Sequence, residues 1–526
     1  MPADRYVSPE LARSLTELSR GIHRQVGLLI DRRGRVSHVI VGDAHQLFIP
    51  DLRRHRAGTG RFRGLRLIHT HLRGEGLSQD DFTDLALLRL DAVVVIQAQS
   101  DGLPGWAEVG TLAAEMDTKI ADAKPWEVKR IADIHRWDTD FLEFIGELES
   151  RFSRRDSTRR IPGAEGAIVI GVATRDPNSA HASLDELERL AETAGLQVMA
   201  RFLQVRRKRD GRYIVGKGKL QEILVRAMQL GADLLIFDSE LSPSQLRNIA
   251  TDTELKVVDR TQLILGIFAQ RAKTREGKLQ VELAQLRYRK PRLAVMPTAM
   301  SRLTGGIGGT GPGESKLEIN RRRADERMNR LEKQLKKLGR DRSLRRARRK
   351  KVGLPQVSLV GYTNAGKSTL LNRMTRSNVD AEDKLFATLD PTSRRMRFPQ
   401  AREVILTDTV GFIRQLPKDL VHAFRSTLEE VVEADLLIEV VDAASPDIDT
   451  HLGEVEDTLA RLGCEKTPVI RVLNKVDAVD TALWSGLKER YQGLLVSAQS
   501  GAGLDELLIQ IERHLFRERT GATGGA

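Results

Sequence analysis

The chain has 526 residues, which is long enough for three or four domains of ordinary size. Its single cysteine, Cys464, excludes a disulfide framework and favours a reducing compartment, so we expect a cytoplasmic protein. The first residues lack the apolar core of a signal peptide, and no apolar run approaches the ~20 residues that span a bilayer, so we expect no membrane span.

The net charge of +13 is distributed unevenly along the chain. Residues 352–526 hold 20 Lys and Arg against 26 Asp and Glu, a balance of −6, so residues 1–351 carry +19. A basic front joined to a mildly acidic C-terminal part predicts that the front binds a polyanion. Nucleic acid is the favoured polyanion. An anionic membrane is the alternative, and the absence of a lipidation motif or an aromatic-rich amphipathic stretch disfavours it.

Residues 1–125 are predicted to form an N-terminal α+β domain, because apolar strand patterns alternate there with helical ones. The predicted strands are Val26–Ile30, Ser37–Val41, Leu65–Ile68 and Ala92–Ile96. Residues 126–165 are polar and charge-rich, which predicts a linker with one helix around Phe141–Phe152.

Residues 166–260 are predicted to form a small α/β subdomain with a parallel sheet. Its expected strands, separated by helical patterns, cover residues 167–173, 198–205, 234–238 and 256–259. A long helix is then predicted from Thr261 to Arg289. The whole chain is therefore expected to be an α/β multidomain protein.

Residues 261–351 are predicted to form a basic helical hairpin with a Gly-rich loop. Residues 305–313 contain six glycines, which suits a loop that threads a crowded cleft. Residues 321–351 hold sixteen Lys and Arg against four acids, and their leucines recur every three to four residues on one face. A charge run is ordinarily a solvated face, but here the balancing acids are missing. The run and its few aromatics favour binding to the phosphate backbone of structured RNA. The candidate RNA contacts are Arg321, Arg322, Arg323, Lys336, Lys337, Arg345 and Arg346.

The segment Gly361–Ser368 has the pattern of a phosphate-binding loop between an apolar strand and a helix. Its glycines let backbone N–H groups face a phosphate chain. Lys367 is expected to reach the β- and γ-phosphates, and the Ser368 hydroxyl is expected to bind Mg²⁺. The predicted nucleotide contacts of this loop are Gly361, Asn364, Ala365, Gly366, Lys367, Ser368 and Thr369.

Three further segments follow in the order that a guanine-nucleotide site requires. Asp408–Gly411 ends an apolar strand, so its carboxylate can act on Mg²⁺ through the water shell and its glycine amide can sense a γ-phosphate. Asn474–Asp477 follows another strand, and Asp477 can accept two hydrogen bonds from guanine that adenine cannot donate. Ser497 and Ala498 are expected to back the base, and Lys475 lies within the base-binding motif.

These segments together predict a GTP hydrolase that uses GTP, GDP and Mg²⁺. Thr388 is the best candidate for a switch threonine that closes on Mg²⁺. The predicted catalytic residues are Lys367, Thr388, Asp408 and Gly411, and the predicted magnesium residues are Ser368, Thr388 and Asp408.

From Gly163 to His514 the chain closely resembles the HflX family of translational GTPases. The resemblance is carried by residues 215–219, 237–248, 258–265, 280–286, 311–318, 386–392 and 408–412. It implies a GTPase domain over residues 352–518 with a mostly parallel sheet, and residues 519–526 are expected to be a disordered tail. It also implies binding to ribosomal RNA of the large ribosomal subunit near the peptidyl-transferase centre, and GTP-controlled splitting or rescue of stalled ribosomes under stress.

Phe412 stands directly after Asp408–Gly411, where many GTPases have a water-orienting glutamine. A phenylalanine cannot polarise water, so we expect slow intrinsic hydrolysis, with help from the ribosome, another switch residue or the neighbouring domain. The simpler interpretation is that Phe412 only packs beneath the switch. Both interpretations can hold together.

The N-terminal domain lies outside that resemblance. His69, His71 and Asp81 resemble the zinc-ligand spacing of JAB/MPN-type metalloproteases. The gap before Ser78 is one residue shorter than is usual in that family, and the catalytic glutamate expected near residues 23–25 is absent. We therefore expect a degenerate, structural or RNA-binding domain, without zinc.

The predicted function is thus a monomeric GTPase that binds the large ribosomal subunit and splits or rescues stalled ribosomes. One alternative is a ribosome-assembly or RNA-remodelling NTPase. A second is a zinc isopeptidase in the N-terminal domain that the GTPase regulates.

Overall fold

The computed structural model describes residues 1–49, 62–113, 126–159, 164–174, 176–253, 255–293, 316–375, 385–386, 389, 391–398, 402–414 and 425–516. The chain forms two compact units. Unit 1 comprises residues 1–175, 196–235 and 248–257, and unit 2 comprises residues 176–195, 236–247 and 258–526. No helix in the described part of the chain is both long and apolar enough to cross a membrane. The Gly-rich segment 305–313, Thr388 and the tail 519–526 lie outside the described residues.

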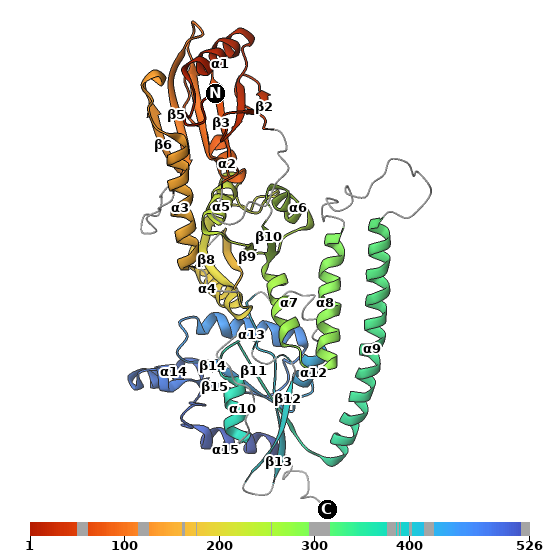
Figure 1. The fold of residues 1–526 in the computed structure, drawn as a ribbon. Helices are drawn as coiled ribbons and strands as arrows, with labels where there is room; N and C mark the ends of the chain where they lie inside the picture. Colours follow the sequence, from red (N-terminus) through yellow and green to blue (C-terminus); the bar gives the residue numbers. More distant parts are fainter. Residues whose placement is uncertain are drawn as a thin grey trace, which may run out of the picture. The chain divides into compact units, whose positions relative to one another are not determined.

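A six-stranded mixed sheet with the order β2-β1-β3-β4-β5-β6 forms the centre of the N-terminal domain (Figure 1). Strands β3 and β4 are parallel, and the other neighbours pair antiparallel. The four predicted strands are confirmed, whereas β5 and β6 were not predicted. The strands are β1 (Val26–Asp31), β2 (Val36–Val41), β3 (Leu65–His71), β4 (Ala92–Ala98), β5 (Pro104–Leu112) and β6 (Trp126–Ile131).

The linker predicted over residues 126–165 is wrong for its first part. Strand β6 pairs with β5, with Trp126 opposite Leu112. Helix α3 (Phe141–Arg159) buries Phe141, Ile145 and Leu148 in the same core as the sheet, which also confirms the helix expected there. A few apolar residues on one face stabilise these elements. Because charged residues lie between them in the sequence, the composition of the segment does not reveal this apolar face.

Side-chain caps fix where the first helices begin. Helix α1 (Pro9–Ile22) begins after Ser8, whose hydroxyl accepts a hydrogen bond from the backbone N–H of Leu11. Helix α2 (Gln79–Leu87) begins with a capping box in which Ser78 and Asp81 each accept from the other's backbone N–H. A short 3₁₀ turn, η1 (Ile134–Arg136), precedes α3.

A four-stranded sheet with the order β10-β9-β7-β8 follows, as expected for an α/β subdomain. Strands β7 and β8 are parallel, with Gly166 opposite Gln197. Its strands are β7 (Gly166–Ala173), β8 (Gln197–Val205), β9 (Leu234–Phe237) and β10 (Lys256–Asp259). The helices between them are α4 (Pro177–Thr193), α5 (Lys217–Leu230) and α6 (Pro243–Asp252).

The single long helix predicted over Thr261–Arg289 is wrong, because the structure has two helices there. Helix α7 (Arg260–Arg271) ends at an extended Ala272, and α8 (Arg275–Leu293) begins after Thr274. The Thr274 hydroxyl accepts the backbone N–H of Gly277 at 2.9 Å, so this threonine caps a new helix.

The predicted hairpin is confirmed for α8 and α9 (Lys316–Val352), which lie side by side in Figure 1. Ion pairs join the two helices, among them Arg327–Glu282 at 2.7 Å and Arg287–Glu332 at 2.7 Å. Within α9, Ala324 and Leu331 are buried. The hairpin is therefore held by a narrow apolar contact flanked by exposed ion pairs.

The GTPase part of unit 2 is a six-stranded sheet with the order β12-β13-β11-β14-β15-β16. Only β12 pairs antiparallel, so the carboxyl ends of the other strands meet at one edge. The strands are β11 (Gln356–Gly361), β12 (Thr392–Arg397), β13 (Glu403–Asp408), β14 (Leu436–Asp442), β15 (Val469–Asn474) and β16 (Leu494–Leu495).

Helices cover this sheet on both faces (Figure 1). Leu359 packs on one face with Leu370 of α10 and Ile511 of α15, and Val360 packs on the other with Leu428 of α12 and Leu459 of α13. The helices are α10 (Lys367–Thr375), α12 (Arg425–Val432), α13 (Ile448–Leu462), α14 (Trp484–Tyr491) and α15 (Leu504–Phe516), with 3₁₀ turns η3 (Val476–Ala478) and η4 (Thr481–Leu483).

Candidate active site

Two glycines give the phosphate-binding loop its shape. Gly361 leaves strand β11 with φ +148°, and a Cβ atom there would lie 2.2 Å from the Val440 carbonyl oxygen. Gly366 has φ +91°, and a Cβ atom there would lie 2.3 Å from Nδ2 of Asn474. Any side chain at either position would clash as well as adopt a rare backbone conformation. The loop therefore needs glycine at both positions.

Lys367 begins α10 and points back into the loop. Its Nζ donates to the carbonyl oxygens of Tyr362 at 2.7 Å and Gly361 at 3.1 Å. Burial lowers the pKa of Lys367 to about 8, against the opposing effect of Asp408. The ammonium thus contacts two carbonyl oxygens of the loop, and phosphate oxygens can become its stronger partners.

Two of the three residues predicted to act on magnesium lie together, Ser368 at the start of α10 and Asp408 at the end of β13, whereas Thr388 lies outside the described residues. The Ser368 hydroxyl donates to Oδ2 of Asp408 at 2.6 Å, and Asp408 is fully buried. A hydroxyl and a carboxylate beside a phosphate-binding lysine are the hard oxygen donors that Mg²⁺ prefers, so these residues fit the ion.

The segment after Asp408 lies directly against the phosphate-binding loop. The backbone N–H of Thr363 donates to the Phe412 carbonyl at 2.8 Å, and the N–H of Phe412 donates to the Gly361 carbonyl at 3.1 Å. A Cβ atom on Gly411 would lie 3.0 Å from Nζ of Lys367. The Gly411 backbone is therefore close enough to the lysine to respond to a γ-phosphate.

Phe412 is 1% exposed and packs with Val360, Leu428 and Val431. The interpretation that it packs beneath the switch is therefore confirmed. Its ring packs within this apolar core and carries no polar atom, so this residue cannot orient water.

The residues predicted to bind the base are organised by Asn474 at the end of β15. Its Nδ2 donates to the Ala365 carbonyl at 2.8 Å, and its Oδ1 accepts the backbone N–H of Ala498 at 2.9 Å. This one amide joins the phosphate-binding loop to the loop that was expected to back the base. Buried Ser497 accepts the N–H of Ser500 through its hydroxyl.

Three other predicted nucleotide contacts lie at the surface of this region. Asp477 is exposed, as an acceptor for an incoming base must be, and Thr369 is exposed on α10. Lys475 has φ +63°, and its Nζ pairs with Asp442 at 2.8 Å. The described residues predicted for nucleotide binding thus lie around one edge of the sheet.

Tyr362 links the phosphate-binding loop to α4, a contact that the sequence did not predict. Its hydroxyl donates to Oε1 of Glu186 at 2.6 Å and accepts the backbone N–H of Arg414 at 2.7 Å. Its ring stacks on His451, with centroids 3.8 Å apart. Burial, and then the charge of Glu186, raise the pKa of Tyr362 far above its usual value, so the hydroxyl remains a hydrogen-bond donor.

Arg260 completes this cluster from the start of α7. Its guanidinium pairs with Glu186 and Asp238, each at 3.0 Å, and donates to the Arg414 carbonyl at 3.2 Å. Burial alone would lower the pKa of Arg260, but Asp238 and Glu186 raise it overall, so it stays charged. No short sequence motif contains these residues, because Glu186 and Tyr362 alone lie 176 positions apart.

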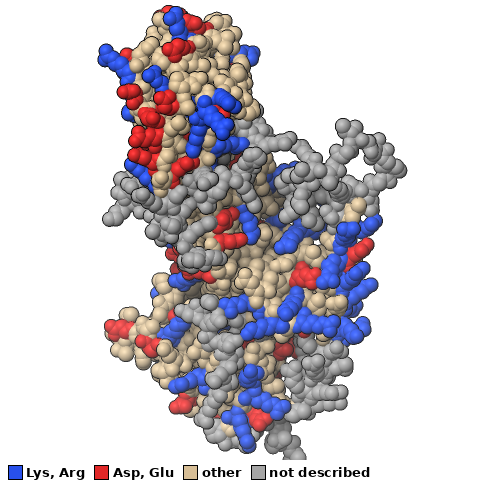
Figure 2. Space-filling model, viewed as in Figure 1, with Lys and Arg blue, Asp and Glu red and all other residues tan. Residues whose placement is uncertain are grey.

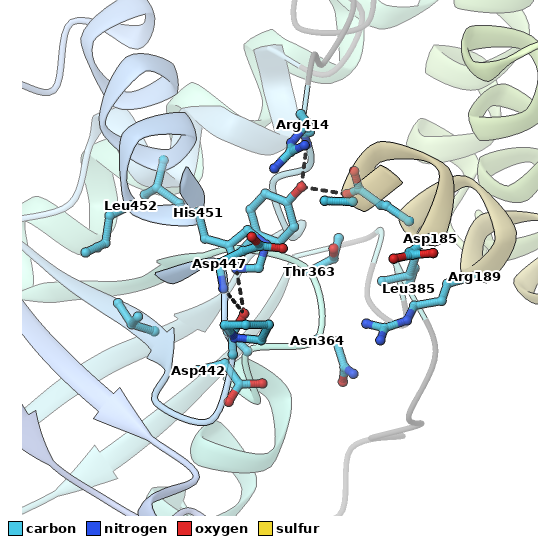
Figure 3. Close-up of a pocket in the computed structure, with 18 of the residues that line it drawn as sticks. Asp185, Arg189, Thr363, Asn364, Leu385, Arg414, Asp442, Asp447, His451 and Leu452 are labelled. Atoms are coloured by element: carbon cyan, nitrogen blue, oxygen red, sulfur yellow. Dashed lines mark hydrogen bonds between the residues drawn. The ribbon is translucent and has the colours of Figure 1, made fainter. Parts of the chain in front are cut away.

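A pocket of about 190 Å³ lies between α4 and the phosphate-binding loop (Figure 3). Helix α4 contributes Asp185, Glu186 and Arg189, and the loop contributes residues 362–365. In Figure 3 the Arg189 side chain extends from α4 toward Asn364. The remaining lining includes Leu385, Arg414, Asp442, Asp447 and His451.

The candidate RNA-binding residues lie on α9. Arg321, Arg322 and Arg323 are exposed, as are Lys336 and Lys337, whereas the side chains of Arg345 and Arg346 lie outside the described part. Figure 2 shows Lys and Arg side chains gathered along this hairpin. Asp325 and Glu332 are already paired with Lys290 and Arg287 of α8.

In the N-terminal domain the structure brings His69, His71 and Asp81 together. All three are buried, and one ligand atom of each lies within 4.8 Å of the others. Nε2 of His69 lies 3.1 Å from Nε2 of His71 and 3.1 Å from Oδ1 of Asp81. Strand β3 presents both imidazoles because residues two apart share one face, and the capping box of α2 places the carboxylate.

Three family models match consecutive parts of the chain. They are described as the N-terminal region of a GTP-binding GTPase (residues 181–269), its middle region (271–349) and a 50S ribosome-binding GTPase (356–475). The solved GTP-binding protein of Sulfolobus solfataricus in complex with GDP is 24% identical and covers 67% of this chain and 99% of its own, with a TM-score of 0.37.

Curated relatives are far more similar. GTPase HflX of Caldanaerobacter subterraneus subsp. tengcongensis is 49% identical over 354 residues, which are 67% of this chain and 81% of that protein. GTPase HflX of Escherichia coli is 42% identical over 363 residues, which are 68% of this chain and 85% of that protein. With 49% and 42% identity to these two relatives over about two thirds of its length, the chain belongs to the HflX family of GTPases, and it binds GTP and hydrolyses it to GDP and phosphate.

Proposed function

We propose that this GTPase binds the large ribosomal subunit and, under control of GTP, splits or rescues stalled ribosomes under stress. The observation that carries the proposal is the excess of exposed Lys and Arg on α9, in unit 2 with the GTPase sheet. Phosphate groups of ribosomal RNA are the partner that such a face recognises. The match to a model described as a 50S ribosome-binding GTPase supports the same partner.

Control by GTP would act through Asp408–Phe412. The backbone of this segment pairs with Gly361 and Thr363, so a γ-phosphate that draws in the Gly411 amide must rearrange those pairs. Ser368, Asp408 and Thr388 would hold Mg²⁺ in the nucleotide complex. Through Tyr362, Arg414 and Arg260 the rearrangement would reach α7 and the hairpin that follows it.

The test is sedimentation of intact ribosomes with the full-length protein and a non-hydrolysable GTP analogue. We expect the subunits to separate and the protein to migrate with the large subunit. Lys336→Glu/Lys337→Glu should bind more weakly, and its affinity should fall less steeply with salt than that of the unmodified chain. A matched control is Lys488→Glu, a basic residue of α14 in the same unit.

Two results would contradict this function. If the protein bound the large subunit equally well with GDP and with the GTP analogue, GTP would not control binding. Binding only to incomplete large subunits would instead favour the alternative, a ribosome-assembly or RNA-remodelling NTPase.

We propose a second, separate function for the N-terminal domain, which is to hold a zinc ion between His69, His71 and Asp81. This reverses the expectation from sequence. In a tetrahedral zinc site with Zn–N distances of about 2.0–2.1 Å, two ligand nitrogens lie about 3.3 Å apart. The Nε2 atoms of His69 and His71 lie 3.1 Å apart, which is close to that separation. His71 Nδ1 lies 3.0 Å from the Glu75 carbonyl, which would leave its Nε2 lone pair for a metal.

The role of such a zinc would be structural. A hydrolase of this kind needs a glutamate as its general base, and residues 23–25 contain none. The isopeptidase alternative therefore lacks that group. Elemental analysis of the full-length protein should give about one zinc per chain, falling to none in His69→Ala/His71→Ala. A metal-free protein that also fails to bind added zinc would contradict this function and leave the ribosome proposal untouched.

A further inference from the structure

We propose that Arg189 of α4 supplies in cis the positive charge that stabilises the transition state of GTP hydrolysis. The contact between Tyr362 and Glu186 positions it. This assignment accounts for a reaction whose usual water-orienting position is occupied by the buried Phe412.

The position of Arg189 follows from how α4 is held. The Glu186 carboxylate accepts the Tyr362 hydroxyl at 2.6 Å, which anchors α4 to the second residue of the phosphate-binding loop. Arg189 follows Glu186 by three residues, so both face the same side of the helix. Arg189 lines the same pocket as Thr363 and Asn364, and Figure 3 shows its side chain extending toward Asn364.

Arg189 and Arg414 are the arginines that line this pocket among the residues that the structure describes. Arg414 is 7% exposed, and its guanidinium donates to the Ser179 carbonyl at 3.0 Å, so it already has a structural role. Arg189 is exposed at the pocket edge, where its long side chain can turn toward an incoming phosphate. Lys367 is held inside the loop by the carbonyl oxygens of Gly361 and Tyr362, whereas Arg189 reaches the pocket from α4.

The charges that line the pocket favour such a cation. The carboxylates of Asp185 and Asp447 also line it, and they repel a triphosphate. A guanidinium between them and the γ-phosphate offsets that repulsion and can form two parallel hydrogen bonds to phosphate oxygens.

The reaction itself needs no covalent bond to the protein. The oxygen of a water molecule bonds to the γ-phosphorus as the bond from that phosphorus to the β–γ bridging oxygen breaks. The electron pair of the broken bond stays on GDP, and the water proton passes to a phosphate oxygen or to solvent. Negative charge spreads over the γ-phosphoryl oxygens and the bridging oxygen in the transition state, and Arg189 stabilises that charge.

The test is GTP turnover by full-length Arg189→Ala, measured alone and with ribosomes. We expect kcat to fall about 100-fold or more while the affinity for GDP changes less than about threefold. GDP with aluminium fluoride, a mimic of the transition state, should no longer form a stable complex. Arg189→Lys should recover part of the rate, because it restores the charge without the planar fork.

Arg461→Ala is the matched control, since it removes an exposed arginine from α13 in the same unit. It should turn over GTP like the unmodified protein. Turnover by Arg189→Ala within twofold of that rate would overturn the proposal. A loss confined to nucleotide affinity would also overturn it, because Arg189 would then be only a binding residue.

The positioning role has its own readout. Tyr362→Phe removes the hydroxyl that holds Glu186 and should lower kcat several-fold with little change in GDP affinity. In the Arg189→Ala background the same change should lower kcat little further, because the two residues act as one unit. Fully additive losses would show that Tyr362 acts independently of Arg189 and would overturn its positioning role.

Discussion

The hydroxyl of Tyr362 lies 2.6 Å from the carboxylate of Glu186, although the two residues are 176 positions apart in the chain. One belongs to the phosphate-binding loop and the other to α4. Their hydrogen bond is one of the contacts by which α4 meets the nucleotide site within unit 2.

Replacing Glu186 with alanine should destabilise α4. Arg260, which is 3% exposed, would lose one of its two carboxylate partners, and removing half of a buried ion pair costs about 3–5 kcal/mol before the remaining partner is considered. Because Asp238 remains, we expect a loss of about 2–4 kcal/mol in the free energy of local opening. Hydrogen exchange of the α4 amides measures it. Glu186→Gln, which keeps an acceptor oxygen, should lose less than half as much, and equal protection in all three proteins would contradict the structure.

Nucleotide binding should take up protons near pH 8. Burial lowers the pKa of Lys367 to about 8 in the free protein, so above that pH the amine is largely neutral. Phosphate favours the charged ammonium and raises its pKa, so affinity should decrease as pH rises through about 8. Calorimetry of GDP binding at pH 8.5, in buffers of different ionisation enthalpy, measures the uptake. Lys367→Arg stays charged and should take up no proton; a pH-independent affinity in the unmodified protein would contradict the lowered pKa.

Replacing Asp477 with asparagine should relax the choice of base. An amide can accept one hydrogen bond from guanine but not the pair that a carboxylate accepts, and each missed bond costs about 1–3 kcal/mol. We expect GDP affinity to fall about 10- to 100-fold and xanthosine diphosphate to bind better than it does to the unmodified chain. Competition against a fluorescent nucleotide measures both. An unchanged affinity for GDP would mean that Asp477 does not contact the guanine base.

The hairpin should depend on Leu331. This side chain is fully buried on a helix whose other faces are mainly charged, so Leu331→Ala removes a large share of its apolar contact. A change of this kind in a core costs about 2–5 kcal/mol. Hydrogen exchange over residues 319–340 should show faster opening, whereas exposed Lys336→Ala should change it by less than about 0.5 kcal/mol. Unchanged exchange in Leu331→Ala would mean that α8 does not stabilise α9.

The strands and loops of the nucleotide site could be predicted from local sequence. Apolar runs that end at Gly361, Asp408 and Asn474 correspond to β11, β13 and β15, because parallel strands buried on both faces are continuously apolar. Local sequence patterns failed to predict elements in which charged residues outnumber the few buried apolar ones. The composition of residues 126–131 predicts a linker where the structure has strand β6, and the apolar pattern over 261–289 does not reveal the capping Thr274 that divides α7 from α8.

The sequence by itself determined the chemistry of this protein, since a phosphate-binding loop needs its glycines, lysine and serine next to one another and the base-binding residues follow single strands. Tertiary structure alone decided which residues outside those motifs meet the loop. It placed Glu186, Arg189 and Arg260 beside Tyr362, whereas the spacing of His69, His71 and Asp81 already suggested a set of ligands that the structure brings together. Such contacts depend on how separate elements pack against each other, and this packing produces no periodic pattern in the sequence.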